Sequence, residues 1–183
     1  MDVTENGLRS AVKSLTDIVS PAVNPKDPLA NEQLKLVIDY LEFVRSRIDY
    51  LCFRETFELR ENVKIAEAFH HCGAPISDQN RTILEASVSN AHKVLDAHEL
   101  RGDVIRTVAS EVAAIIREIV RESSGFDITF RHKVEQIVLD MSAERINFER
   151  SWYLPLGFDP SPKEVPSLNI VISKIQDKND TYF

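Results

Sequence analysis

The stretch DVIRTVASEVAAIIREIV, residues 103–120, sets the fold class. Its large apolar side chains recur at spacings of three and four residues: Ile105, Val108, Val112, Ile115 and Ile119. This period matches one face of an α-helix, while most of the charged residues between them fall on other faces. We therefore expect a helix that packs one apolar face into a core.

The same pattern extends in both directions along the chain. Apolar stripes predict a short helix over residues 8–19, a long helical tract from Pro28 to about Cys72, a helix after Ser77 that is interrupted at Gly102, and a last helix reaching about Arg150. Only five glycines occur in 183 residues, which favours helices over a turn-rich β-protein. The sequence predicts an all-α fold, a bundle of four to five helices with one long helical arm.

Capping residues mark where these helices begin and end. Asp27 before Pro28 is typical of a helix N-terminus. Gly73 predicts a left-handed helix end, and Ser77 or Asp78 can cap the helix that follows, so a helical hairpin is expected here. Within the long tract the apolar register is interrupted, and we expect a stutter, a bend or a change of packing partner near residues 53–58.

The composition changes after Arg150. Four prolines occur between residues 151 and 183, together with the run LNIVISKI, residues 168–175, whose β-branched residues predict one short β-strand. We expect a helical bundle domain over residues 1–150 and a Pro-rich extended tail over residues 151–183. A lone strand leaves its backbone groups unpaired, so the tail is expected to pack on the bundle or on a partner subunit.

This tail holds the residues best suited to an interface. Its aromatic and aliphatic side chains either cover the open end of the bundle or dock another subunit, since aromatic residues anchor interfaces. The predicted interface residues are Trp152, Tyr153, Leu154, Phe158, Ile170 and Ile172.

The segment EAFHHCGAPISDQ, residues 67–79, has the most candidate ligands for a metal. Glu67 and His70 are three residues apart and share a helix face, as in di-metal bundles, but those bundles need the motif twice and it occurs once. If the two helices of the hairpin run antiparallel and in step, His92 lies about 20 Å away and cannot join them. A divalent metal at Glu67 and His70 is one interpretation. The other is that no cofactor binds, and the histidines interact with the helix dipole.

Several classes of function have no support. The P-loop, Rossmann and hydrolase-elbow motifs are absent, so no enzyme class is indicated. The net charge of -7 disfavours nucleic acid and anionic membranes as partners. No run of 18 apolar residues and no signal peptide are present, and the two cysteines lie too far apart to pair, so a cytoplasmic location is expected.

Two functional hypotheses follow. The first is a non-enzymatic helical interaction or assembly module that forms a homo-oligomer or binds a protein partner, because long striped helices and an unpaired strand indicate burial between subunits. The second is a metal- or small-ligand-binding bundle, with or without enzymatic activity, that uses Glu67 and His70.

Overall fold

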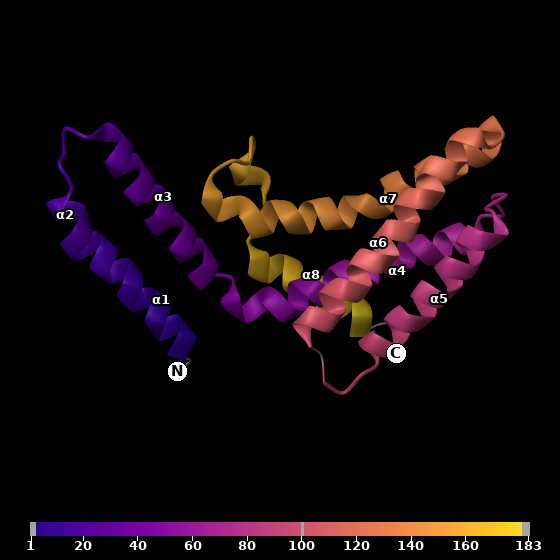
Figure 1. The fold of residues 1–183 in the computed structure, drawn as a ribbon, viewed down its shortest axis with the longest axis horizontal. Helices are drawn as coiled ribbons and strands as arrows, with labels where there is room; N and C mark the ends of the chain where they lie inside the picture. The colour runs from indigo at the N-terminus through magenta and orange to yellow at the C-terminus, as the bar shows by residue number, and fades with distance from the viewer. Residues whose placement is uncertain (1–2, 100, 181–183) are drawn as a thin grey trace. The chain divides into compact units, whose positions relative to one another are not determined.

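The computed structural model describes residues 3–99 and 101–180. Every regular element in these ranges is helical, which confirms the all-α class (Figure 1). Seven of the described helices have twelve residues or more, rather than the predicted four to five helices in all.

The chain divides into two compact units. We call Leu51–Phe148 the core unit, and Met1–Tyr50 together with Glu149–Phe183 the hairpin unit. These units group residues by contact, and the predicted domains 1–150 and 151–183 stay a prediction.

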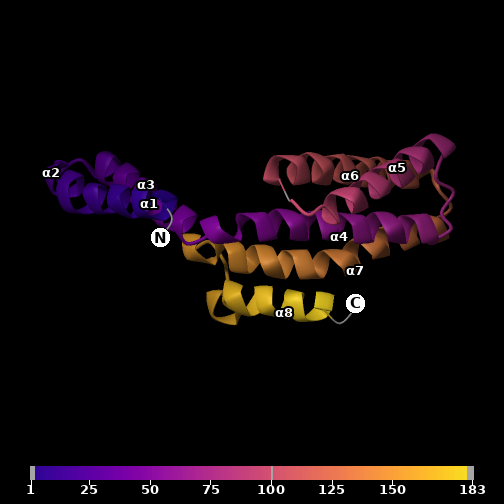
Figure 2. The same cartoon turned by 90° about the horizontal axis from the view of Figure 1, so that it is seen from below.

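The core unit is built around α6 (Gly102–Glu122). This helix packs against both α4 (Leu51–His71) and α5 (Asp78–Leu95), as the two ribbon views show (Figures 1 and 2). The five apolar side chains that predicted α6 are all buried. Burying each such side chain contributes about 1.5–3 kcal/mol, so this stripe is the main reason the three helices associate.

The first part of α7 (Ile128–Tyr153) completes the core unit. Phe148 is buried, and its ring centroid lies 4.6 Å from that of Phe57 on α4. The buried Asn62 side chain donates to the Ala109 carbonyl oxygen of α6 at 3.2 Å and accepts from Arg145 of α7 at 3.4 Å. One amide therefore links three helices and meets its own hydrogen-bonding needs in the core.

The corner between α4 and α5 forms as the caps predict. Gly73 has a φ of 71°, which favours glycine, and the Ser77 hydroxyl accepts from the Asn80 backbone N–H. The sequence did not indicate that Glu122, at the end of α6, would reach across to this corner. Its carboxylate accepts from the Ser77 backbone N–H at 2.8 Å and from the Asn80 side chain at 2.7 Å. Burial raises the pKa of Glu122, but these hydrogen bonds outweigh burial and lower the pKa below its ordinary value.

Replacing Glu122 with glutamine should lower the free energy of unfolding by about 1 kcal/mol at pH 7, because the glutamine side chain has one acceptor oxygen and can accept from only one of the Ser77 and Asn80 donors. A group with a lowered pKa stabilises the fold above its ordinary pKa, and this contribution is lost as pH falls through the folded-state pKa. The difference between wild type and Glu122→Gln should therefore shrink below about pH 4. Urea denaturation at pH 7 and below about pH 4 measures this difference in the free energy of unfolding. The control is Glu118→Gln, an exposed position on the same helix. A constant difference at all pH values would contradict this role.

The N-terminal part of the hairpin unit is a pair of antiparallel helices. α1 (Val3–Ser14) continues through one π-helical turn, Leu15–Val19, into the short α2 (Ser20–Ala22), and α3 (Pro28–Arg45) returns beside α1 (Figure 2). The Asp27 carboxylate accepts from the Ala30 backbone N–H at 3.0 Å, which confirms the predicted cap.

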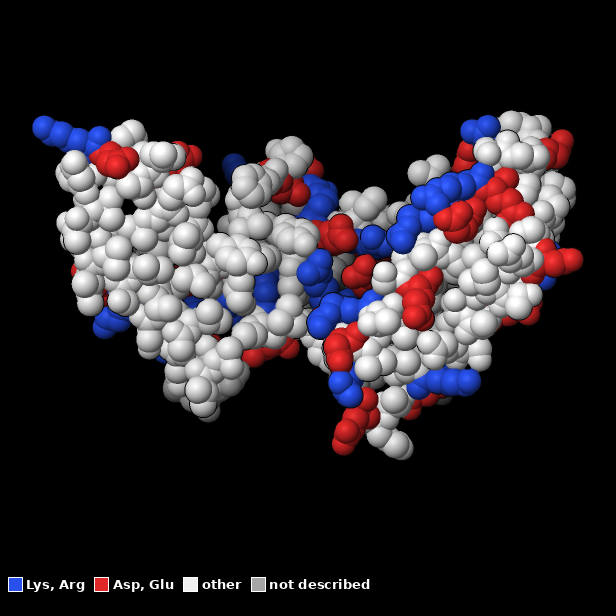
Figure 3. Space-filling view, viewed as in Figure 1, with Lys and Arg blue, Asp and Glu red and all other residues white. Residues whose placement is uncertain are grey.

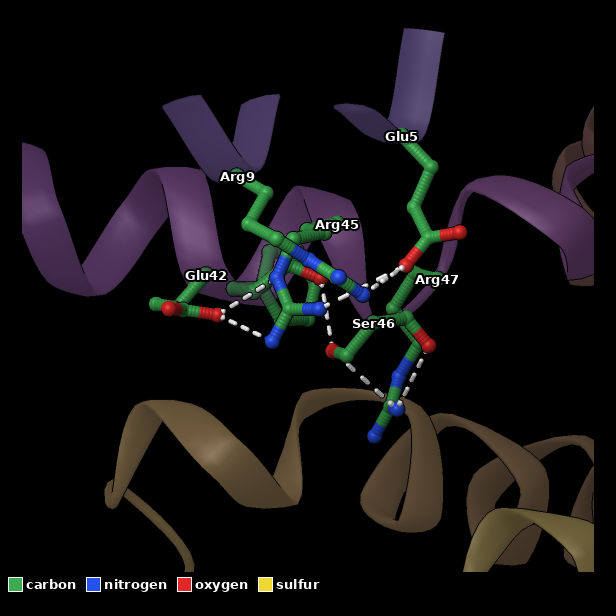
Figure 4. Close-up of polar contacts among 7 residues, drawn as sticks. Glu5, Arg9, Glu42, Arg45, Ser46 and Arg47 are labelled. Carbon is green, nitrogen blue, oxygen red and sulfur yellow. Dashed lines mark hydrogen bonds and ion pairs between the residues drawn. The ribbon is translucent and has the colours of Figure 1, made fainter. Parts of the chain in front are cut away.

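Ion pairs fix the open end of this helical pair. The Glu5 carboxylate of α1 lies 3.0 Å from Arg9 and 3.7 Å from Arg45 of α3, and Arg45 also contacts Glu42 at 2.8 Å (Figure 4). Such partly exposed pairs contribute little each, so they orient the two helices more than they stabilise them.

The prediction of one long helical arm from Pro28 to Cys72 is wrong, because this tract is not a single continuous helix. The helical tract is interrupted at residues 46–50, where one 3-10 turn, Ile48–Tyr50, precedes α4, and the bend expected at residues 53–58 falls inside α4. Neither glycine nor proline marks this interruption. Instead, the Ser46 hydroxyl donates to the Phe43 carbonyl oxygen, and the Arg47 side chain turns to contacts more than 100 residues away.

The predicted β-strand over residues 168–175 is also wrong, because this segment begins α8 (Leu168–Asp180). Its side chains Leu168, Val171, Ile172 and Ile175 are all buried and occur at i, i+3, i+4 and i+7. This spacing fits a helix face as well as the β-branched composition fits a strand. Packing of that face therefore overrides the local preference for a strand.

The segment before α8 is folded rather than extended. It contains two 3-10 turns, Leu154–Leu156 and Pro162–Glu164. Arg150 donates to the two carboxylate oxygens of Asp159 at 2.9 and 3.0 Å, and this pairing lowers the pKa of Asp159. A bidentate arginine–carboxylate pair fixes geometry well, so it closes the turn after α7.

None of the helices within the described residues combines the length and apolar character needed to cross a membrane.

Candidate functional sites

A small cavity lies between α4 and α5, close to the Gly73 corner. Its volume is about 280 Å³, and its lining combines two acidic residues, two histidines and an apolar floor: Glu67, His70, His71, Leu84, Glu85, Val88 and Ser89. Leu84 is buried, whereas the histidine and glutamate side chains are substantially exposed. The cavity therefore has an apolar base and a polar rim.

Two carboxylate–imidazole pairs bridge the helices at this cavity. Glu67 Oε1 lies 2.9 Å from His92 Nε2, and Glu85 Oε1 lies 3.6 Å from His70 Nδ1. The expectation that His92 lies about 20 Å from Glu67 is therefore wrong.

That expectation assumes that α4 and α5 run antiparallel and in step, which their contacts contradict. Between the pair His70–Glu85 and the pair Glu67–His92, α4 moves by three residues and α5 by seven. The two helices therefore cross at an angle, as Figure 1 shows. Steps of three and of seven residues both stay on one face of a helix. The sequence therefore indicates which residues share a face on each helix, but not the angle at which α4 and α5 cross.

Glu67 and His70 do not converge on one point. Each instead contacts a residue of α5, and the rings of His70 and His71 meet edge to face with centroids 5.1 Å apart. The Cys72 thiol donates to the Phe69 carbonyl oxygen at 3.2 Å. Among the described residues, no group of three or more His, Cys, Asp or Glu side chains is placed to hold a metal ion. Metal binding at Glu67 and His70 stays a prediction.

The six predicted interface residues differ widely in exposure. Trp152 and Ile172 are buried and Leu154 is half-buried, whereas Tyr153 and Ile170 are exposed and Phe158 is 83% exposed. Three of the six therefore present apolar surface, and the others pack within the protein.

Arg47 connects the end of α3 to the end of α7 within the hairpin unit. Its guanidinium donates to the carbonyl oxygens of Ser151 at 3.2 Å and Trp152 at 3.0 Å, and it lies over the rings of Phe43 and Trp152 at 5.9 and 5.8 Å. Burial lowers the pKa of Arg47. Figure 4 shows its side chain pointing away from the Glu5–Arg45 contacts. Arginine side chains at a helix C-terminus satisfy its free carbonyls, so Arg47 joins these segments.

α3 has an uncovered apolar face. None of its eighteen residues is buried. Four large apolar side chains at i, i+7, i+8 and i+11 form the α3 face, with exposures of 66, 51, 49 and 59%: Leu29, Leu36, Val37 and Tyr40. Over α1 and α3, the face in view in Figure 3 carries few charged side chains.

The α1–α3 pair has little burial to hold it together. Of the described residues before Tyr50, Val12 alone is a buried apolar residue. Ordering each residue costs about 1–2 kcal/mol of backbone entropy, and helices of this length are marginal without tertiary packing. The apolar surface on α3 is thus available to a partner, and covering it would stabilise the helical pair.

Comparison of the chain with protein-family models, curated proteins and solved structures gives no match.

Proposed function

We propose that this protein is a non-enzymatic helical assembly module that forms a homo-oligomer through the α3 face. What carries the proposal is that α3 exposes four large apolar side chains along one side while none of its residues is buried. Contiguous exposed apolar surface of this kind is typical of interfaces between proteins.

A second copy of the same chain is the partner that this surface favours. Leu36, Val37 and Tyr40 lie together on the α3 face, so two copies can bring these side chains into contact without burying a charge between them. Two helical pairs that meet on these faces would form a four-helix bundle, a common arrangement for self-association. Tyr40 of this face begins a row of aromatic rings with Phe43 and Tyr153, whose centroids are 6.2 and 5.9 Å apart, and this row would extend the interface.

Replacing Leu36 with glutamate should separate the copies. The charge would be placed in the centre of an apolar interface, at a cost of several kcal/mol, so the dissociation constant should rise by about 100-fold or more. Size-exclusion chromatography with light scattering measures the mass. Leu36 is 51% exposed, so each copy should keep its helical content by circular dichroism.

Leu139→Glu is the matched control, because Leu139 is a 68% exposed leucine on α7 of the core unit. This variant should have the same mass as wild type. An unchanged mass for Leu36→Glu, or an equal loss for Leu139→Glu, would contradict assembly through the α3 face.

A second candidate function is the binding of a small ligand at the cavity between α4 and α5. It is favoured by the two carboxylate–imidazole pairs, which place Glu67 and His70 at the rim of a real cavity. A cytoplasmic location and the absence of a nucleic-acid partner stay predictions.

A further inference from the structure

We propose that the cavity between α4 and α5 binds a small organic cation, specifically a primary amine on a short apolar chain. The charge of the residues that line the cavity favours a cation. Glu67 and Glu85 contribute two carboxylates, and none of the described residues that line the cavity is a lysine or an arginine. The field in the cavity therefore attracts a cation and repels an anion.

The two glutamates also have carboxylate oxygens that can accept hydrogen bonds from a ligand. Glu67 Oε1 shares a hydrogen bond with His92, and Glu85 Oε1 lies at the longer ion-pair distance of 3.6 Å from His70. Among the described residues, no side chain or backbone group donates to the Oε2 atoms. An ammonium group has three N–H donors, so it can donate to a carboxylate oxygen on either wall of the cavity.

The base of the cavity is apolar and suits an alkyl chain. Leu84 and Val88 provide apolar surface below the carboxylates, so a ligand with a short alkyl chain can bury that chain while its head meets the rim. The volume of about 280 Å³ is well above the roughly 10–15 Å³ that one water needs, so the cavity has room for a short alkyl chain. Lengthening the chain from three to four carbons should improve affinity by up to about fourfold.

A metal ion fits this cavity less well than an organic cation. No three ligating side chains of the described residues converge, as a tetrahedral zinc site requires. The two walls instead offer separate hydrogen-bond acceptors, a pattern that suits a donor-rich head group.

The test is a titration of the full-length protein with n-butylamine at pH 7, followed by NMR of the histidine side chains. The matched ligands 1-butanol and butyrate keep the chain and change the charge, at constant ionic strength. Butylamine should shift the His70 and His71 resonances, butanol should bind at least about tenfold more weakly, and butyrate should not bind. Glu67→Gln and Glu85→Gln should each weaken butylamine binding by about tenfold.

Glu118→Gln removes the same charge from an exposed site on α6, and it should leave binding unchanged. The proposal would be overturned if butanol bound as tightly as butylamine, or if neither Glu67→Gln nor Glu85→Gln weakened butylamine binding. It would also be overturned if Glu118→Gln weakened butylamine binding as much as the cavity variants do. Stoichiometric Zn²⁺ binding that depends on Glu67, without any response to butylamine, would assign the cavity to a metal instead. The variant Leu36→Glu should bind butylamine like wild type, so this test is separate from the test of assembly.

Discussion

Replacing Trp152 with alanine should lower the free energy of unfolding by about 3–5 kcal/mol. Trp152 is 2% exposed and is the largest fully buried side chain of the described residues. Its removal leaves a cavity beneath the Arg47 guanidinium, which now lies 5.8 Å from the indole ring. Arg47 would then lose the ring contact that supports its hydrogen bonds to the end of α7. Urea denaturation followed by circular dichroism measures the loss.

Phe158→Ala is the control for this effect. Phe158 lies in the same C-terminal segment but is 83% exposed, so its replacement should change stability by no more than about 0.5 kcal/mol. Hydrogen exchange should also quicken in α3 for Trp152→Ala alone. Equal effects of the two substitutions would show that Trp152 is not a packing centre.

Phe69→Ala should have a similarly large effect, about 3–5 kcal/mol, in the core unit. Phe69 is buried in the last turn of α4, among the apolar residues that pack around α6. Its carbonyl oxygen also accepts from the Cys72 thiol, so the cavity left by the ring would loosen the turn that leads into Gly73. The expected result is a lower urea midpoint and faster hydrogen exchange at the α4–α5 corner.

Ile83→Ala provides the comparison for Phe69→Ala. Ile83 is on α5 of the same unit but is exposed, so it should cost no more than about 0.5 kcal/mol. If Phe69→Ala lowered the free energy of unfolding no more than Ile83→Ala does, the packing of Phe69 around α6 could not be central to the core.

The sequence predicts best what depends on neighbouring residues. The α6 stripe from Ile105 to Ile119, the Asp27 cap and the Gly73 corner all follow from spacing or from local hydrogen bonds, and all are found. Such features need only a few residues in a row, so a single sequence contains enough information to place them.

Long-range contacts decide what the sequence could not predict. The interruption before α4 depends on Arg47 reaching Ser151 and Trp152, which no local pattern indicates. The run LNIVISKI fits both a strand and a helix, and only the packing of Leu168 and Ile175 separates the two. Local propensity is a weak guide in such segments.

The candidate sites show the same limit. The E-x-x-H motif marked Glu67 and His70 correctly as neighbours on one face, but the partners His92 and Glu85 depend on the angle between two helices. On α3, the sequence shows an apolar stripe but not which side of the helix is covered. Leu34 and Leu41 are half-buried, whereas Leu36 and Tyr40 are exposed.

The most direct test of assembly is sedimentation velocity of the wild-type, full-length chain over a range of micromolar concentrations. If the α3 faces pair, the protein should sediment with at least twice the mass of one chain, and Leu36→Glu should sediment as a single chain. A wild-type protein with the mass of one chain at every concentration, and with α3 protected from hydrogen exchange, would contradict the account.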